Sequence, residues 1–233
     1  MTLPTIFQGK LNIPVIAAPM FLVSGTELVI SACKAGVVGT FPALNARSTD
    51  EFADWLDQIK DALDEEDAPY GVNVPLSAHR RARLSEDLAV MKSREVPLVI
   101  TSIGNPKEIV EEIHSYGGLV FHDVTTLHHA RKAAQAGVDG LILVCAGAGG
   151  HGGALNPFAF VEQVRQFFDG TIVLAGSIVT GRAVRAAVTM GADLAYVGTR
   201  FIATKEAPVH QNVKEAILSA TELDTRLIMR HLR

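Results

Sequence analysis

The chain has 233 residues, with 21 lysines and arginines against 25 aspartates and glutamates, and a formal net charge of −4. This balance gives no basic surface for a nucleic-acid backbone, so we expect no nucleic-acid partner. The longest apolar run, residues 13–23, contains two prolines and is far shorter than the ~20 residues of a membrane helix. Two distant cysteines and an amino-terminal segment without a basic, then apolar, signal pattern predict a cytoplasmic protein without disulfides or a membrane anchor.

Eight short apolar segments run along the chain and are separated by amphipathic ones. They are residues 14–20, 37–41, 70–74, 97–103, 118–124, 140–144, 171–178 and 194–198. Their nearly continuous Val, Ile and Leu content, without polar alternation, is typical of parallel strands that are covered on both faces.

The segments between the strands carry helix start and stop signals. Residues 24–27 and 48–51 have the form of a capping box, with Ser24 and Ser48 followed three positions later by glutamate. Gly36, Gly137 and Gly191 stand where helices are expected to end in a left-handed turn.

Successive predicted strands start about 25 residues apart, which is the spacing of a βα unit repeated eight times. We therefore expect a (β/α)8 TIM barrel that forms one domain over residues 1–233. The alternative is an open doubly wound sheet, which usually carries a G-x-G-x-x-G turn after its first strand. Here the corresponding residues 18–25 read APMFLVSG and offer no such turn.

The active site of such a barrel is built from the carboxyl ends of the strands and the loops that follow them. Small and polar residues stand at most of these positions. They are Ala18, Pro19 and Met20 after the first strand, Asn73 in the third, His122 and Asp123 in the fifth, the CAGAGGHGG loop 145–153 with His151 after the sixth, and Gly176, Ser177, Gly198, Thr199 and Arg200 after the last two.

The turns after the seventh and eighth strands suit a phosphate group. Gly176, Ser177, Gly198 and Thr199 leave backbone N–H groups accessible, and a helix amino terminus follows each turn. Phosphates commonly bind at this place in barrels. The alternative is a pair of ordinary tight turns.

The glycine-rich loop exposes backbone around a single histidine. Gly149 and Gly150 have no side chains that would keep a flat ligand away, and His151 can exchange a proton near neutral pH because its ordinary pKa is ~6.5. We expect His151 to act in acid–base catalysis or in orienting a substrate. The alternative is a loop histidine without a role.

Several other chemistries are excluded. Asp123 is the only strand-end carboxylate, whereas glycoside hydrolysis needs two. His122 and Asp123 are neighbours in a strand and so point to opposite faces, which argues against a metal site. A phosphate site, an asparagine, a glycine wall and one histidine instead suit a flat, phosphorylated redox cofactor such as FMN.

Long stretches of the chain resemble one family. These are PVIAAPM, GVNV, DVTTLHHARKAAQAGVDGLILVCAGAGGHGG and IVLAGSIVTGRAVRAAVTMGADLAYVGTRFIATKEA, and together they resemble the nitronate monooxygenases. The resemblance implies FMN-dependent oxidation of alkyl nitronates or nitroalkanes by O2 to a carbonyl compound and nitrite. It also implies that His151 is the catalytic histidine. It assigns Ala18, Pro19, Met20, Asn73, Asp123, Gly149 and Gly150 to the flavin ring, and Gly176, Ser177, Gly198 and Thr199 to the phosphate.

The sequence departs from the family pattern at a few positions. Gly147 stands where many members have a glutamate, Asp123 where some have a flavin-contacting lysine, and Ser177 where the second glycine of a pair is usual. The family usually continues beyond Arg233 into further helices, so we expect the carboxyl-terminal helices to be truncated. Two alternatives stay open: an NAD(P)H-dependent flavin reductase of the quinone or enoyl-acyl carrier protein type, and a flavin-binding protein with little turnover. A homodimer is the expected assembly if the protein associates.

Overall fold

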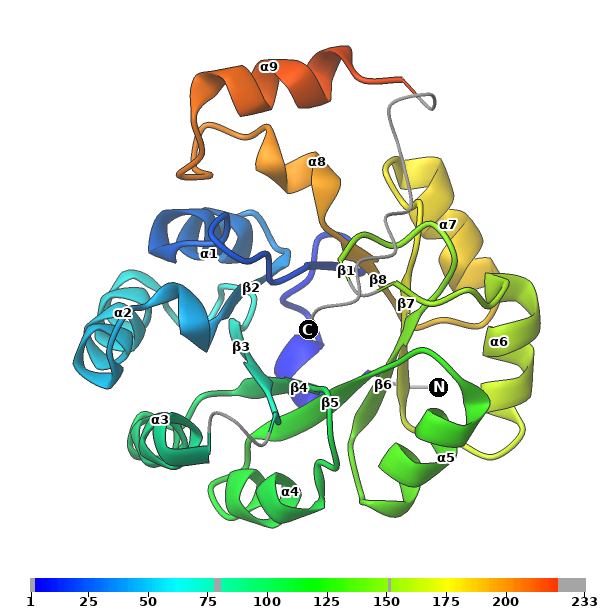
Figure 1. Ribbon diagram of the computed structural model, residues 1–233, viewed down its shortest axis with the longest axis horizontal. Helices are drawn as coiled ribbons and strands as arrows, with labels where there is room; N and C mark the ends of the chain where they lie inside the picture. Colours follow the sequence, from blue (N-terminus) through cyan, green and yellow to red (C-terminus); the bar gives the residue numbers. More distant parts are fainter. Residues whose placement is uncertain (1–2, 78–80, 151, 222–233) are drawn as a thin grey trace.

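Eight parallel strands close into a barrel in the computed structural model, which describes residues 3–77, 81–150 and 152–221. The strands lie in chain order around the ring (Figure 1), and β1 closes it by pairing with β8. They are β1 (Val15–Ala17), β2 (Val38–Pro42), β3 (Gly71–Pro75), β4 (Leu98–Ser102), β5 (Leu119–Val124), β6 (Gly140–Val144), β7 (Thr171–Ala175) and β8 (Leu194–Val197). The predicted (β/α)8 barrel and all eight of its strands are confirmed. That residues 1–233 form a single domain stays a prediction.

Helices surround the barrel and connect its strands (Figure 1). They are α1 (Thr26–Lys34), α2 (Thr49–Ala62), α3 (Arg81–Ser93), α4 (Lys107–His114), α5 (Leu127–Gln135), α6 (Pro157–Arg165) and α7 (Gly181–Thr189), followed by α8 (Thr199–Ile202) and α9 (Gln211–Ser219) after the last strand. Two short 3-10 helices, η1 (Thr5–Phe7) and η2 (Ala43–Asn45), complete the described elements. None of the helices in these ranges is long and apolar enough to cross a bilayer.

One of the two predicted capping boxes is confirmed and the other is wrong. The Ser48 hydroxyl caps α2 by accepting the Glu51 N–H at 3.1 Å. Gly25 directly precedes α1, and no side chain caps this helix. The Ser24 hydroxyl does not cap it because it accepts the Met20 N–H, at 3.0 Å, instead. A tertiary contact of the β1–α1 loop has overridden the local signal.

The predicted stops after α1, α5 and α7 are confirmed, since Gly36, Gly137 and Gly191 have φ angles of +72°, +86° and +103°. Residues with a Cβ rarely adopt this left-handed conformation. Each helix can therefore end and turn toward the next strand within a few residues.

The core has two parts, one between strands and helices and one inside the barrel. The inner part is apolar and includes Ile16, Ile100, Phe121 and Leu194, all fully buried. Phe7 of η1 closes it at the amino-terminal end, with its ring 6.1 Å from that of Phe121. Apolar side chains thus fill the barrel interior from its amino-terminal end.

Candidate functional site

A cavity of about 1490 Å³ opens at the carboxyl ends of the strands. Ligand pockets usually have about 300–1,000 Å³, so this one has room for a cofactor and a second molecule. Its walls come from the loops after β1, β4, β6, β7 and β8, from the first residue of α4 and from residues along the length of α5.

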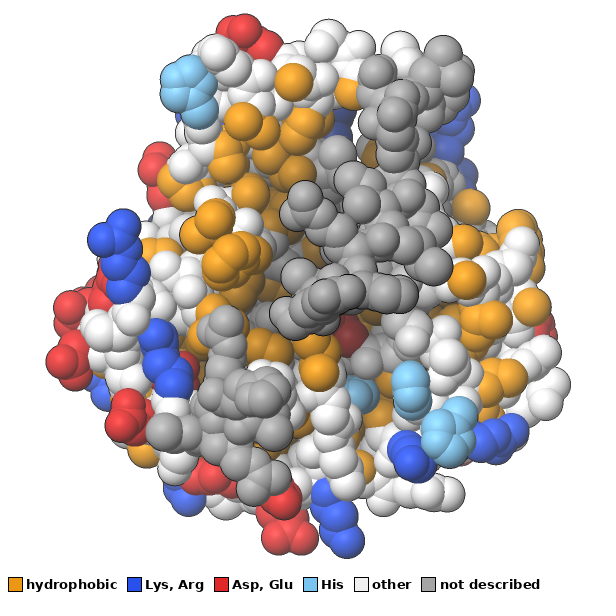
Figure 2. All heavy atoms as spheres, in the orientation of Figure 1, with side chains coloured by type: hydrophobic (Ala, Val, Ile, Leu, Met, Phe, Trp, Pro, Cys, Tyr) orange, Lys and Arg blue, Asp and Glu red, His pale blue; other side chains and the backbone are white. Residues whose placement is uncertain are grey.

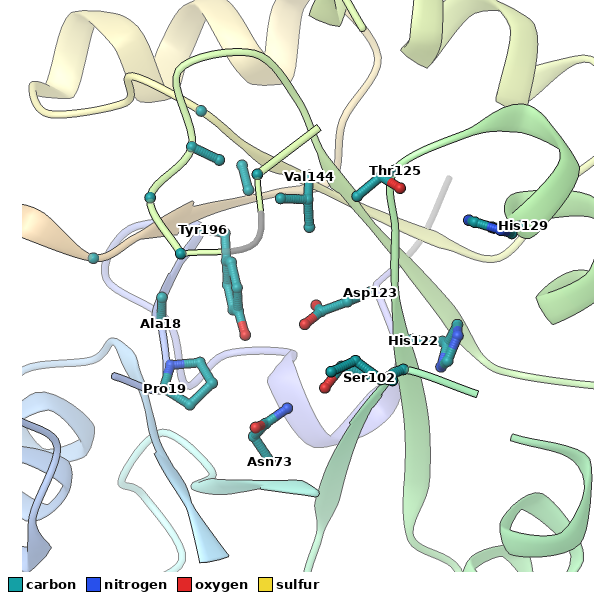
Figure 3. Close-up of a pocket in the computed structure, with 18 of the residues that line it drawn as sticks. Ala18, Pro19, Asn73, Ser102, His122, Asp123, Thr125, His129, Val144 and Tyr196 are labelled. Atoms are coloured by element: carbon teal, nitrogen blue, oxygen red, sulfur yellow. The ribbon is translucent and has the colours of Figure 1, made fainter. Parts of the chain in front are cut away.

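The floor of the cavity is built from residues in or just after the carboxyl-terminal halves of seven strands. These floor residues are Ala18, Asn73, Ser102, Asp123, Val144, Ala175 and Tyr196. Side chains alternate between the two faces of a strand, so six of these residues lie two positions beyond a residue of the inner core, as Asp123 lies beyond Phe121. Asn73 is the exception, since it follows Gly71 at this spacing. Figure 3 shows Asn73, Ser102, Asp123 and Tyr196 pointing toward the same space.

Asp123 is the acidic residue of this floor. Its Oδ1 atom is buried and has no hydrogen-bond partner among the described residues. Burial raises the pKa of the carboxyl from 3.8 to about 7, because removal from water penalises the charged form. Asp123 therefore holds a proton over much of the acidic and neutral pH range.

Tyr196 supplies a second unpaired group. Its hydroxyl oxygen is buried and is likewise without a hydrogen-bond partner in the described part of the chain. Burial, and next to it the negative charge of Asp123, keep the pKa of this phenol well above its ordinary value. The hydroxyl is thus neutral and can donate a hydrogen bond to a ligand.

Asn73 is oriented by its neighbouring strand. Its amide nitrogen donates to the Ile100 carbonyl at 3.1 Å, which leaves the amide oxygen as an acceptor. The floor therefore combines one fixed acceptor with the two unpaired groups of Asp123 and Tyr196. Asn73 and Asp123 were both predicted from the sequence, and both line the cavity.

The loop after β1 is held in place by one side chain from η2. Asn45 donates to the carbonyls of Met20 and Ser24, at 3.0 and 2.7 Å, and accepts the Leu22 N–H at 2.9 Å. Ala18, Pro19 and Met20, the predicted ring-contacting residues, line the cavity on this side.

The glycine-rich loop forms another wall. Gly149 and Gly150 line the cavity, and a Cβ built on either residue would meet no atom within 4 Å. A side chain would therefore have room at either position, and the two glycines leave this stretch of backbone uncovered, as a flat ligand requires. His151, the predicted catalytic residue, lies outside the described residues.

The four predicted phosphate-binding residues all line the cavity. Gly176 has a φ of +135°, and a Cβ there would press against the Ala146 carbonyl at 2.8 Å. Ser177 faces the neighbouring loop, because its N–H donates to the Gly147 carbonyl at 3.1 Å and its hydroxyl to the same atom at 3.4 Å. Gly198 and Thr199 begin α8. Phosphate binding here stays a prediction.

His122 points away from the floor, on the opposite side of β5 from Asp123 (Figure 3), as the alternation of strand side chains predicts. The Thr101 hydroxyl donates to the Phe121 carbonyl at 3.1 Å and lies 2.7 Å from Nδ1 of His122. Since the hydroxyl has only one proton, both contacts are satisfied when Nδ1 carries the imidazole proton. Burial, with a smaller effect of His129, lowers the pKa of His122 to about 4, so the ring is neutral at neutral pH.

Sequence reasoning missed part of the cavity. Ser102 and Tyr196 were not predicted, although each stands two positions after an inward-facing apolar residue. Lys107, His129 and Lys132 line the outer part of the cavity, and Figure 2 shows histidine and basic side chains gathered over α5. Cys145 is a buried core residue, and burial raises the pKa of its thiol to about 11.

Comparison with known families agrees with this architecture. The model of one family, described as nitronate monooxygenase, matches residues 5–232. The chain belongs to the nitronate monooxygenase family. Its members are flavin-dependent oxidoreductases. The resemblance seen in the sequence is thereby confirmed.

Individual relatives carry several different names. A Mycobacterium tuberculosis protein named (3aS,4S,5R,7aS)-5-hydroxy-7a-methyl-1-oxo-octahydro-1H-indene-4-carboxyl-CoA dehydrogenase is 28% identical over 89% of this chain and 57% of its own length. The structure of FabK from Thermotoga maritima has a TM-score of 0.81 at 28% identity, covering 91% of this chain and 66% of FabK. The nitroalkane oxidase from Streptomyces ansochromogenes has a TM-score of 0.81 at 27% identity, covering 91% and 72%. The chain thus spans less than three fifths of the length of the first curated relatives.

The residues present fit a flavin. Two buried polar atoms of the floor, Asp123 Oδ1 and Tyr196 OH, have no partner within the described ranges, and the glycine wall above them has open space. The carbonyl oxygens and N–H groups of a heteroaromatic ring would form hydrogen bonds with these two atoms, and the ring itself would occupy the open space.

Proposed function

We propose that the protein binds FMN in this cavity and oxidises alkyl nitronates or nitroalkanes with O2 to a carbonyl compound and nitrite. The observation that carries the proposal is the combination, in one cavity, of a polar floor, an open glycine wall and the small-residue turns after β7 and β8. The family match supports the same conclusion.

Each part of the cavity has a role in this proposal. Ala18, Pro19 and Met20 and the Gly149–Gly150 wall would hold the flavin ring from different sides, and Asn73 would orient it through its free amide oxygen. Gly176, Ser177, Gly198 and Thr199 would hold the phosphate. When bound, FMN supplies the electron-accepting group that the side chains themselves lack.

The remaining step falls to His151. Its imidazole would take the α-proton of a neutral nitroalkane, or hold the nitronate in place, since its ordinary pKa is near neutral. This role is implied by the family resemblance and by the position of the residue in the glycine-rich loop.

An absorbance experiment tests the proposal. Purified protein reconstituted with FMN is expected to show a protein-bound flavin spectrum that bleaches on anaerobic addition of propyl-2-nitronate, with nitrite released once air is admitted. His151→Ala is expected to bind FMN but to lose most nitrite release from nitroethane. Failure of the protein to bind FMN would contradict the proposal.

A second candidate is reduction of a larger substrate at the expense of NAD(P)H. Phe21, Ile103 and Val179 line the mouth of the cavity and are 64%, 55% and 53% exposed, which favours a substrate with an extended apolar part. The likeness to FabK and to the indene carboxyl-CoA dehydrogenase supports it. NAD(P)H would then bleach the flavin anaerobically without any nitronate, whereas the leading proposal expects no such bleaching.

A further inference from the structure

We propose that Asp123, in its protonated form, and the Tyr196 hydroxyl together donate hydrogen bonds to the acceptor atoms of the flavin ring, so that flavin binding is coupled to protonation of Asp123. The inference rests on the proposed function and adds two residue roles to it: a neutral carboxylic acid at a position where some family members carry a lysine, and a tyrosine that no resemblance assigns.

Geometry supports the pairing. Asp123 and Tyr196 come from β5 and β8, and their polar ends point into the same space above the inner core (Figure 3). Neither Asp123 Oδ1 nor Tyr196 OH has a hydrogen-bond partner in the residues that the structure describes. Two buried polar groups without partners are costly, and a ligand that accepts from both would remove the cost.

The surrounding residues leave this role to Asp123. The nearest floor groups are uncharged, namely Asn73 on β3, Ser102 on β4, Val144 on β6 and Tyr196 on β8. His122 faces the other side of β5. Lys107, His129 and Lys132 belong to the outer part of the cavity, on α4 and α5, and within the described ranges none of them forms an ion pair with Asp123.

The protonation state follows from the chemistry of the two partners. The flavin ring presents carbonyl oxygens and bare ring nitrogens, which accept hydrogen bonds. An ionised Asp123 would place a second acceptor with a negative charge against them, whereas the protonated carboxyl can donate. A bound ring also excludes water from the floor, which further penalises the ionised form.

The coupling can be written as a balanced equilibrium. Protein with ionised Asp123, one proton from solvent and one flavin form the complex in which Asp123 is protonated and donates to the ring. Above the pH at which free Asp123 loses its proton, binding must take up one proton, and the dissociation constant rises tenfold per pH unit. Below that pH, no proton is taken up and the affinity is constant.

The test measures flavin affinity against pH by fluorescence quenching, with riboflavin as the probe because it has no phosphate that titrates. Wild-type protein is expected to bind riboflavin with constant affinity from pH 5.5 to about 6.5 and up to tenfold more weakly per unit above about pH 7. Asp123→Asn keeps the shape and an N–H donor but cannot ionise, so its affinity should not fall in this way. Any pH dependence of riboflavin affinity that this variant retains comes from other titrating groups.

Two controls separate the roles of the pair. Tyr196→Phe is expected to weaken binding by about three- to tenfold at every pH, as one lost hydrogen bond does, while it keeps the wild-type pH profile. Ser115→Ala, outside the cavity lining, is expected to keep both. Calorimetry of the wild type at pH 8 in two buffers of different ionisation enthalpy should give about one proton taken up per riboflavin, and this measurement needs no variant.

The outcomes distinguish the two proposals. A wild-type profile equal to that of Asp123→Asn, or no proton uptake at pH 8, would overturn the inference and leave the proposed function standing. Absence of binding at pH 6, by wild type and variants, with FMN as well as riboflavin, would contradict the proposed function and the inference with it.

Discussion

The Gly147 carbonyl accepts the Ser177 N–H at 3.1 Å, and a Cβ built on Gly147 would collide with the Ser177 hydroxyl. The loops after β6 and β7 are therefore fitted to each other at these two positions. Both are departures from the family pattern, in which many members have a glutamate at the first position and a glycine at the second. In this chain the serine hydroxyl occupies the space in which a side chain at 147 would begin.

Gly147→Ala is expected to lower the free energy of unfolding by about 1–3 kcal/mol, because the residue has a φ of +86° and its new methyl group would meet Ser177. Adding Ser177→Gly should recover part of this loss, since it removes the collision but leaves the left-handed backbone. Urea denaturation measures both. Gly149→Ala is the control and should change stability by less than about 0.5 kcal/mol, so equal losses at 147 and 149 would contradict the explanation.

Gly149→Val is expected to weaken FMN binding by tenfold or more while the fold is kept. Gly149 lines the cavity, and a Cβ built there meets no atom within 4 Å, so a valine side chain fits the fold and would compete with a ring bound against this wall. Fluorescence titration with FMN measures the effect. Gly181→Val, also open to solvent but outside the cavity lining, is the matched control; unchanged FMN binding by Gly149→Val would show that the ring does not lie here.

The stability of the protein is expected to fall between about pH 4 and pH 7 through Asp123. Burial raises the pKa of this carboxyl from its ordinary value of 3.8 to about 7 in the folded state, so the folded protein binds more protons than the unfolded chain in this range. The contribution is fully present below the ordinary pKa and is lost as the pH rises through the folded value. Within this range, each pH unit lowers the free energy of unfolding by at most about 1.4 kcal/mol.

Asp123→Asn should therefore gain stability relative to wild type as the pH is raised from 5 to 8. Urea denaturation at the two pH values, without flavin, gives the comparison. Ser102→Ala, a change on the same floor at a group that does not titrate in this range, should change stability equally at both. A constant difference between Asp123→Asn and wild type would mean that the carboxyl is not protonated in the folded state.

Asn45→Ala is expected to weaken FMN binding although Asn45 is not part of the predicted cofactor contacts. Its side chain makes three hydrogen bonds to the loop that carries Met20, and without them Ala18, Pro19 and Met20 would lose their fixed positions. Asn12→Ala is the control, because it removes one hydrogen bond to Ala35, at 3.1 Å, outside the cavity lining. If both variants bind FMN alike, the loop is held by other contacts.

The sequence predicts the barrel well because its signals are local. Continuous apolar segments mark the strands, and glycines such as Gly36 and Gly191 mark the helix ends. Boundaries were less accurate, as in the first strand, which ends at Ala17 rather than residue 20. The capping role of Ser24 was wrong because a hydrogen bond to Met20, which depends on the folded loop, competes with the cap.

The site was predicted where turn residues differ from their surroundings and missed where the strand itself supplies the group. Gly149, Gly176 and Asn73 stand out in the sequence and line the cavity. Ser102 and Tyr196 do not stand out, since their importance depends on which face of β4 and β8 points inward. That information comes from the register between strands rather than from any one segment.

Closure of the ring through β1 and β8 has a consequence for how the chain folds. Val15 pairs with Ala195, and Ala17 with Val197, so the last contact joins residues about 180 positions apart in the sequence. A ribosome must release nearly the whole barrel before this contact can form, and until then both edge strands expose unpaired backbone groups. Such long-range closure is slow, and we expect the nascent chain to be most prone to aggregation just before the segment that contains Leu194 emerges.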